Sequence, residues 1–321
     1  MSDVENLVVR LLDGERRALA RLLTLVEDGA HAVQRDVVAA LHPRTVGARI
    51  VGITGSPGVG KSSLTSALVT ALRAGGRRVA VLAVDPSSPL TGGALLGDRI
   101  RMQAHHGDDG VFVRSMAARG HLGGLAAAVP TAVLVLDAAG FDDVIVETVG
   151  VGQSEVDVAA MADTTVIVLA PGLGDSVQAA KAGILEVGDV LAVNKADQPG
   201  AGRLEAELRG MLDLGHVVAT GASAEGSWTA PVLRTVAVRG EGIEELLDAI
   251  DEHGRATVRS TGAALARARR WVVELAAGRV RDVLVAPDGP LHDRLEELAA
   301  DVAARRIDPV TAAERLTVEL G

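Results

Sequence analysis

The chain has 321 residues, with 32 Lys or Arg against 42 Asp or Glu, so its formal net charge is −10. This length allows one large domain with extensions or two modest domains, and 48% apolar with 23% charged residues is typical of a globular protein. The absence of cysteine excludes disulfides, thiolate nucleophiles, iron–sulfur clusters and cysteine-based zinc sites, and a pI near 5.3 argues against a basic face for duplex DNA.

The N-terminus mixes acidic and basic residues and lacks the basic start and apolar core of a signal peptide. The most apolar stretch, residues 122–136, is interrupted by Pro130 and is shorter than the roughly 20 residues that a membrane span needs. We therefore expect a soluble, cytoplasmic protein whose partners include neither nucleic acid nor a membrane.

The first forty residues carry an amphipathic helical pattern. Apolar side chains recur at the spacing i, i+3, i+4 and i+7 of one helix face, in Leu19, Leu22, Leu23 and Val26. This pattern changes after His42-Pro43. Residues 1–45 are therefore predicted to form an N-terminal helical extension.

Residues 46–254 alternate short Val- and Ile-rich runs with Ala- and Leu-rich segments of helical length. Most of the runs are apolar throughout, which is typical of strands buried on both faces of a parallel sheet with helical crossovers. The pattern predicts a doubly wound α/β domain with a mostly parallel sheet. The expected strands are 49–54, 78–85, 111–115, 143–147, 164–170, 189–194 and 232–236.

After about Gly254 the strand signals stop, and Ala, Arg and Leu dominate to the end of the chain. Asp308-Pro309 is typical of an N-cap followed by Pro at the first helical position. Helical spacing is kept by Leu291, Leu295, Leu298 and Val302. Residues 255–321 are predicted to be a C-terminal helical extension. For both extensions two roles stay open: packing on the central domain, or building the interface of a homodimer.

The strongest motif lies between a predicted strand and a predicted helix and satisfies the pattern G-x-x-x-x-G-K-[ST]. Its glycines let successive backbone N–H groups point at phosphate oxygens, and the helix N-terminus adds a positive partial charge. Lys61 is expected to reach the β- and γ-phosphates, and the Ser62 hydroxyl to bind Mg²⁺. The predicted phosphate-contacting residues are Gly55, Ser56, Pro57, Gly58, Val59, Gly60, Lys61, Ser62 and Ser63.

A second strand ends in an acid that can serve the same metal. Glu147 closes the run 143–147 and can hold Mg²⁺ directly or through water, and the Gly150 N–H can sense the γ-phosphate. Asp85, at the end of another strand, and Asp98, in a loop, are further candidate acids for the metal.

The base site is indicated by Asn194-Lys195-Ala196-Asp197, directly after a predicted strand. A carboxylate at Asp197 can accept hydrogen bonds from N1–H and the 2-amino group of guanine, a donor pair that adenine lacks. Asn194 can tie this loop to the phosphate loop, and the Lys195 stem can cover the base. Together with the other two motifs, the pattern predicts GTP and GDP as ligands.

These residues together resemble the MeaB/ArgK family of methylmalonyl-CoA mutase-associated GTPases. The resemblance covers nearly the whole chain and is carried by ITGSPGVGKSSL, VDPSSPLTGGALLGDRIRM, VRSMAARGHLGGL, VIVETVGVGQSEVD, PGLGDSVQAAKAGILE and VNKAD. It implies a cytoplasmic homodimer that binds an adenosylcobalamin-dependent acyl-CoA mutase and uses GTP to gate cofactor loading and to protect or restore the mutase.

The resemblance also implies particular site residues. The Mg²⁺ region maps onto Ser62, Asp85, Asp98 and Glu147, and the base contacts map onto Asn194, Lys195, Asp197, Val236, Ala237 and Val238. Val236 stands where a Ser is common in the family, so backbone contacts to guanine are expected there in place of a hydroxyl. Residues 171–186 resemble a nucleotide-responsive switch that faces the mutase, with Gly172, Gly174, Asp175 and Lys181 as its candidate residues.

The catalytic residues expected here are Lys61, Glu147 and Gln153. In small signalling GTPases a water-orienting Gln follows the glycine of the acid-x-x-G motif, whereas Val151 stands at that position here and Gln153 lies two residues further on. We therefore expect slow hydrolysis that a partner stimulates. Arg114 and Arg119 are candidate cations for the transition state, but a structural or solvated role is the favoured interpretation for both. The pair His105-His106 is expected to lie in a loop or on the surface.

Three other functions remain open from the sequence. A nickel-insertion GTPase would need a Cys- or His-rich tract, and this chain has neither. A kinase linked to basic amino-acid transport would transfer phosphate to a protein. A binding module would keep its GTP unhydrolysed.

Overall fold

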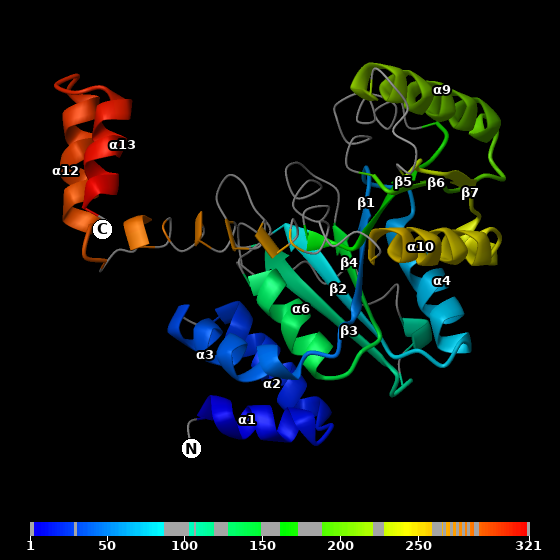
Figure 1. Ribbon diagram of the computed structural model, residues 1–321, viewed down its shortest axis with the longest axis horizontal. Coiled ribbons are helices and arrows are strands. Elements are labelled where there is room, and N and C mark those ends of the chain that lie inside the picture. The colour runs from blue at the N-terminus through cyan, green and yellow to red at the C-terminus, as the bar shows by residue number, and fades with distance from the viewer. Residues whose placement is uncertain are drawn as a thin grey trace. The chain divides into compact units, whose positions relative to one another are not determined.

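The computed structural model describes residues 3–28, 31–86, 103–105, 107–118, 128–148, 161–172, 188–220, 228–258 and 289–319, together with single residues and short runs between 265 and 285. The chain divides into two compact units, Met1–Arg267 and Ala268–Gly321. The larger unit contains the α/β domain and the smaller one a pair of helices (Figure 1).

The described residues form a seven-stranded sheet in the order β3-β2-β4-β1-β5-β6-β7, and each neighbouring pair of strands is parallel. The predicted doubly wound α/β class and all seven predicted strands are thereby confirmed. The strands are β1 (Arg49–Thr54), β2 (Val79–Pro86), β3 (Val111–Ala118), β4 (Asp143–Thr148), β5 (Thr164–Leu169), β6 (Val190–Val193) and β7 (Val232–Arg234).

Helices cover the two faces of the sheet, and the alternation of side chains along β5 shows which helix covers which face. Val166 and Val168 belong to the core with α4 (Lys61–Ala74) and α10 (Ile243–Val258). Ile167 and Leu169 pack instead against α9 (Ala201–Thr220). Since successive strand residues point to opposite faces, α9 lies on the other side of the sheet from α4 and α10.

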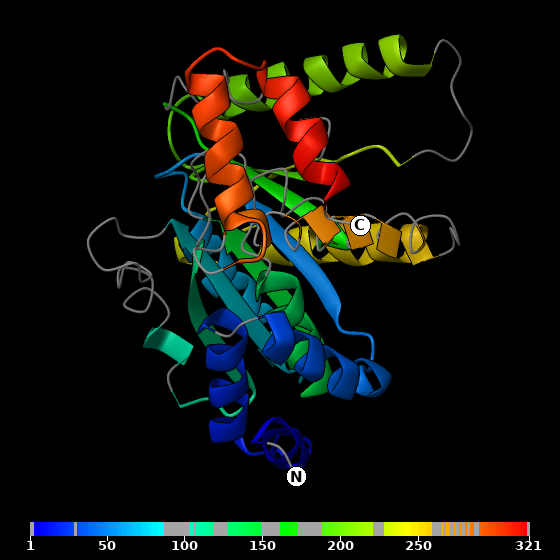
Figure 2. The same cartoon turned by 90° about the vertical axis from the view of Figure 1, so that its left-hand side faces the viewer.

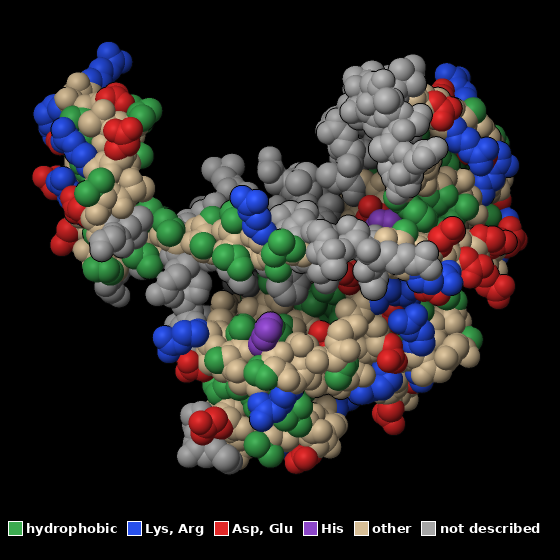
Figure 3. Space-filling model, in the orientation of Figure 1, with side chains coloured by type: hydrophobic (Ala, Val, Ile, Leu, Met, Phe, Trp, Pro, Cys, Tyr) green, Lys and Arg blue, Asp and Glu red, His purple; other side chains and the backbone are tan. Residues whose placement is uncertain are grey.

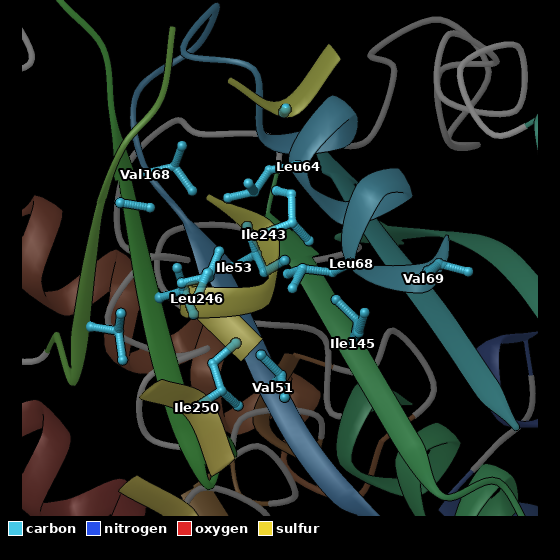
Figure 4. Packing of buried hydrophobic residues seen from close by; sticks show 14 of the residues in the cluster. Val51, Ile53, Leu64, Leu68, Val69, Ile145, Val168, Ile243, Leu246 and Ile250 are labelled. Atoms are coloured by element: carbon cyan, nitrogen blue, oxygen red, sulfur yellow. The ribbon is translucent and has the colours of Figure 1, made fainter. Parts of the chain in front are cut away.

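The larger core lies between the sheet and the helices α4 and α10. Figure 4 shows Leu64 and Leu68 of α4 near Ile243 of α10. Leu246 and Ile250 of α10 belong to the same core farther along the sheet, where Ile250 lies near Val51 of β1. Each of these side chains is 3% exposed or less. Burial of a side chain of this size contributes about 1.5 to 3 kcal/mol, so this core fixes the helix that follows the glycine-rich loop.

The N-terminal helices pack on the α/β domain. They are α1 (Asp3–Leu12), α2 (Arg16–Asp28) and α3 (His31–Leu41), and α2 and α3 contact α6 (Ala128–Ala138) (Figures 1 and 2). The predicted apolar stripe Leu19, Leu22, Leu23 and Val26 is buried to 4% exposure or less. Of the two roles left open for this extension, packing on the central domain is the one observed within this chain.

The smaller unit holds α12 (His292–Ala303) and α13 (Pro309–Val318), joined by a short turn. Leu291 and Leu298 pack against Ala312 and Leu316. The predicted cap is confirmed, because Asp308 Oδ1 accepts hydrogen bonds from the N–H groups of Val310 and Thr311, both at 3.0 Å. The boundary expected at residue 254 and a dimer role for this unit stay predictions.

Charged side chains of both signs are interspersed on the face drawn in Figure 3. Acidic side chains gather on the exposed face of α10, in Glu244, Glu245, Asp248 and Glu252. None of the described helices combines the length and the low charge that crossing a membrane requires.

Candidate functional site

The loop between β1 and α4 takes a backbone path that depends on its glycines. Gly55 has φ +137°, and a Cβ there would lie 2.1 Å from the Val168 carbonyl oxygen. Gly60 has φ +96°, and a Cβ there would lie 2.5 Å from Asn194 Nδ2. The loop therefore lies tightly against β5 and the residue after β6. It delivers the chain into the N-terminus of α4, where the first backbone N–H groups have no partner within the helix.

Lys61 begins α4, and its side chain folds back over this loop. It is 6% exposed, and Nζ donates hydrogen bonds to the carbonyl oxygens of Gly55 at 2.6 Å and Ser56 at 3.1 Å. The ammonium group therefore lies within the curl of the loop, beside the helix N-terminus. A positive charge beside the N–H groups of a helix N-terminus makes a site for phosphate.

Glu147 lies at the end of β4, in register with Ile53 of β1, which brings it beside the first turn of α4. Ser62 Oγ donates a hydrogen bond to Glu147 Oε1 at 2.6 Å, and Thr65 Oγ1 donates one to Oε2 at 2.8 Å. Glu147 is 2% exposed and Ser62 6%. The structure thus brings together Ser62 and Glu147, two of the four residues that the sequence singled out for the metal.

The donors at this position fit Mg²⁺. A Ser hydroxyl and a carboxylate are hard oxygen ligands, and they lie at the mouth of the loop that would hold the phosphates. No group of three or more His, Asp or Glu residues is gathered among the described side chains. This small protein donor set matches a metal that keeps several waters and takes its remaining ligands from nucleotide phosphates. The metal roles of Ser62 and Glu147 stay predictions.

Asn194 joins the glycine-rich loop to the loop after β7. It is 2% exposed, and its Nδ2 donates to the Val59 carbonyl oxygen at 2.9 Å. Its Oδ1 accepts from the Ala237 N–H at 3.1 Å and from Thr235 Oγ1 at 3.3 Å. One buried amide therefore fixes two loops against each other, the tie that the sequence suggested.

Lys195 and Asp197 follow on the exposed side of the same loop. Lys195 has φ +55°, and its Nζ donates to the Gly58 carbonyl oxygen at 2.7 Å. Asp197 Oδ2 accepts a hydrogen bond from Arg239 Nη1 at 3.4 Å, and Arg239 Nε donates to Glu241 Oε1 at 2.7 Å. The Asp197 carboxylate is 40% exposed and so can be reached by a ligand from solvent.

The loop 236–238 lies next to Asn194, but two of its N–H groups are engaged within the protein. The Val236 N–H donates to the Glu241 carbonyl oxygen at 3.0 Å, and the Ala237 N–H donates to Asn194. The backbone contacts to guanine expected from Val236 and Ala237 would therefore need these bonds to be shared or exchanged. Val238 is 82% exposed and presents its side chain beside the proposed base site.

Several predicted residues cannot be placed. Asp85 belongs to β2, next to Val84, which pairs with Thr148, but its side chain is not described. Gly172 is described and has φ +82°. The remaining predicted residues lie outside the described part of the chain: Asp98, His106, Arg119, Gly150, Val151, Gln153, Gly174, Asp175 and Lys181.

Arg114 has the structural role that the sequence favoured. Its Nη2 donates to Glu27 Oε2 at 2.7 Å, and both side chains are under 20% exposed. This pair holds α2 against β3, away from the loop at residue 55. His105 Nε2 lies 3.0 Å from Ser66 Oγ, so it contacts α4.

Sequence reasoning missed Thr65, Thr235 and Arg239, which contact Glu147, Asn194 and Asp197 respectively. The available signal for Thr65 was its spacing of three residues from Ser62, which puts both on one helix face. Thr235 and Arg239 offered no such signal, because their partners are 41 and 42 residues away in the sequence.

Comparisons with known proteins identify chains that are related to this one. The family model described as "Methylmalonyl Co-A mutase-associated GTPase MeaB" matches residues 19–287. A Pyrococcus abyssi protein named as a GTPase is 45% identical and aligns over 99% of this chain and 97% of its own length. The mitochondrial methylmalonic aciduria type A homolog of Mus musculus is 35% identical over 78% of this chain and 62% of that protein.

A crystal structure described as a LAO/AO transport system kinase has the same fold. It superposes with a TM-score of 0.71 at 27% sequence identity and covers 100% of this chain and 99% of its own. The structural match over the whole chain, the glycine-rich loop and the family model all indicate the same family of proteins. The chain therefore belongs to the MeaB family of methylmalonyl-CoA mutase-associated GTPases.

Proposed function

We propose that this GTPase serves an adenosylcobalamin-dependent acyl-CoA mutase, most directly methylmalonyl-CoA mutase. In this role it gates loading of the cofactor and protects or reactivates the mutase. The observation that carries the proposal is the match of 269 residues, 19–287, to the mutase-associated family model. The name of the Mus musculus relative, which refers to methylmalonic aciduria, points to the same metabolism.

The phosphates bind at the loop 55–62 in this proposal. Lys61 exchanges its two carbonyl partners for phosphate oxygens, which offer a full charge in place of a dipole. The backbone N–H groups at the start of α4 hold the β-phosphate. Ser62 and Glu147 hold Mg²⁺, which neutralises phosphate charge when it is bound.

Guanine binds at residues 194–197. Asp197 accepts the N1–H and 2-amino donors of the base, and the Lys195 stem lies along one face of it. Asn194 acts indirectly, because its bonds to Val59 and Ala237 keep the phosphate and base subsites at a fixed separation. An adenine base would leave the Asp197 carboxylate without these donors, which accounts for selectivity.

We expect hydrolysis to be slow in the isolated chain and faster with the partner. Val151 follows the acid-x-x-G sequence and has no group that could orient water. Gln153, Gly150 and the switch segment 171–186 are proposed to acquire their catalytic and signalling positions in the complex. A homodimer through the smaller unit is part of the same proposal.

The likeness to a LAO/AO transport system kinase favours one second candidate, a GTPase or kinase linked to transport of basic amino acids. This function requires phosphoryl transfer to a protein acceptor. Labelled γ-phosphate separates the two candidates, because a GTPase releases it as inorganic phosphate and a kinase leaves it on a protein.

The test is GTP turnover by the purified chain with and without an equimolar adenosylcobalamin-dependent acyl-CoA mutase. We expect a slow basal rate, stimulation by the mutase, and loss of both in Lys61→Ala. Arg203→Ala is the matched control, because this exposed Arg pairs only with Glu207 one turn along α9 among the contacts described for it. If the mutase neither bound the chain nor stimulated turnover, the proposed partner would be wrong, while the GTPase activity would still be supported.

A further inference from the structure

Thr65 is a buried hydroxyl one turn beyond the phosphate loop. It is fully buried on α4, and its Oγ1 lies 2.8 Å from Glu147 Oε2 and 3.0 Å from the Lys61 carbonyl oxygen. The motif G-x-x-x-x-G-K-[ST] ends at Ser62 and does not include this position. Its partner, however, is the acid proposed for the metal.

We infer that Thr65 is a positioning residue for the Mg²⁺ site, holding the Glu147 carboxylate in the orientation that the metal requires. The inference rests on the proposed metal role of Ser62 and Glu147. The terminal torsion of a glutamate is broad, so a carboxylate held at one oxygen can still rotate. Ser62 holds Oε1 and Thr65 holds Oε2, and together these two contacts define the carboxylate plane.

The helix explains why these two hydroxyls act together. Residues three apart lie on the same face of a helix, so Ser62 and Thr65 both face the end of β4. A Thr in a helix has two accessible rotamers, one of which lets the hydroxyl contact the carbonyl oxygen four residues earlier. The contact with the Lys61 carbonyl oxygen fixes that rotamer, and the same rotamer reaches Glu147.

The two hydroxyls have different roles in the proposed metal site, because only the Ser62 hydroxyl is a proposed ligand. The Ser62 oxygen would be a ligand of Mg²⁺ in the proposed site, so its position would depend on the metal as well as on Glu147. Thr65 is not a proposed metal ligand, and its side chain keeps its buried position on α4. It therefore holds the Glu147 carboxylate in one orientation while Ser62 adjusts.

The test compares Thr65→Val with Thr70→Val. Both substitutions replace a hydroxyl by a methyl group of similar size on α4, and both remove a bond to the carbonyl oxygen four residues earlier, but Thr70 makes no contact with Glu147 among its described bonds. Binding of fluorescent GDP is measured across a Mg²⁺ titration and in excess EDTA, together with the melting temperature of the free protein.

We expect Thr65→Val to raise the Mg²⁺ concentration for half-maximal GDP tightening by about tenfold or more, the usual effect of removing a group that orients a metal ligand. Affinity for GDP in EDTA should stay within about twofold of the parent, as the phosphate loop keeps its own contacts. Thr65→Ser should restore the parent Mg²⁺ dependence, and Thr70→Val should leave it unchanged. Thr65→Ala, which places no methyl branch against the carboxylate, should match Thr65→Val.

Three results would overturn the inference. An unchanged Mg²⁺ dependence in Thr65→Val and Thr65→Ala would show that Thr65 does not orient Glu147. Equal weakening of GDP in Mg²⁺ and in EDTA would assign Thr65 to the general stability of the loop. If the parent protein itself bound GDP equally with and without Mg²⁺, the proposed metal site would fail and the inference with it, a result distinct from the other two.

Discussion

Asn194→Ala tests whether one buried amide couples the phosphate and base loops. The substitution removes the acceptor of the Ala237 N–H and the donor to the Val59 carbonyl oxygen. Both groups then lie at a site where the original side chain was 2% exposed. Each unsatisfied buried group costs about 1 to 3 kcal/mol, and partial entry of water lowers the sum, so we expect about 2 to 4 kcal/mol lost from the free energy of unfolding.

The assay is urea unfolding of the nucleotide-free protein followed by tryptophan fluorescence. The chain has two tryptophans, so a Trp271→Phe background leaves Trp228, whose Nε1 donates to the Asp189 carbonyl oxygen in the larger unit, as the reporter. With a slope of about 2 kcal/mol per molar urea, the midpoint should fall by roughly 1 to 2 M.

Lys195→Ala is the matched control for this prediction. It removes the bond from an exposed ammonium group to the Gly58 carbonyl oxygen, and should cost under about 1 kcal/mol because that carbonyl remains open to water. Equal destabilisation by the two substitutions would refute the reasoning, as would a loss under about 0.5 kcal/mol in Asn194→Ala.

Four further outcomes follow from the described contacts. Gly55→Ala should abolish GDP binding in equilibrium dialysis while Gly14→Ala does not, since only at Gly55 would a Cβ meet a backbone atom. Burial lowers the pKa of His253, so as the pH falls the unfolded chain binds the proton before the folded chain does. The free energy of unfolding should therefore decrease below about pH 6.5, and calorimetry should find this pH dependence reduced in His253→Gln. Arg114→Ala should cost about 1.5 to 3 kcal/mol in urea unfolding, through loss of the charge-assisted bond to Glu27. Asp308→Ala should cost the smaller helical unit about 0.5 to 2 kcal/mol, seen as faster amide exchange at the start of α13.

Most of the strands were predictable because they are buried on both faces and therefore read as largely apolar runs. The run 143–147 is an example: the structure buries every residue of β4. The phosphate loop was predictable for a different reason, since its glycines occupy backbone conformations or close contacts that other residues would disrupt. Both signals are local in the sequence.

The contacts that organise the site are not local. Asn194 bonds to Val59 across 135 residues and to Ala237 across 43. The motif predicted a tie to the phosphate loop, but nothing in the sequence specified the bond to Ala237. The pairing of Arg239 with Asp197 likewise depends on how β6 and β7 lie side by side. Sequence motifs named Asn194 and Asp197, and the order of the strands determined which groups these two side chains contact.

That strand order also explains why one loop can communicate with both halves of the site. β1 lies between β4 and β5, and the chain leaves β1 toward β2 on one side of the sheet, while β5, β6 and β7 lie on the other. In open α/β sheets ligands bind at the carboxyl ends of the strands where the winding reverses, and the loop after β1 stands there. It is held from the β4 side by Glu147, through Ser62, and from the β6 side by Asn194, through Val59. A change at the metal and a change at the base therefore reach α4 through separate buried bonds. Thr65→Val should alter the Mg²⁺ dependence of GDP binding, and Asn194→Ala should lower the free energy of unfolding. In the double variant the two effects should be additive.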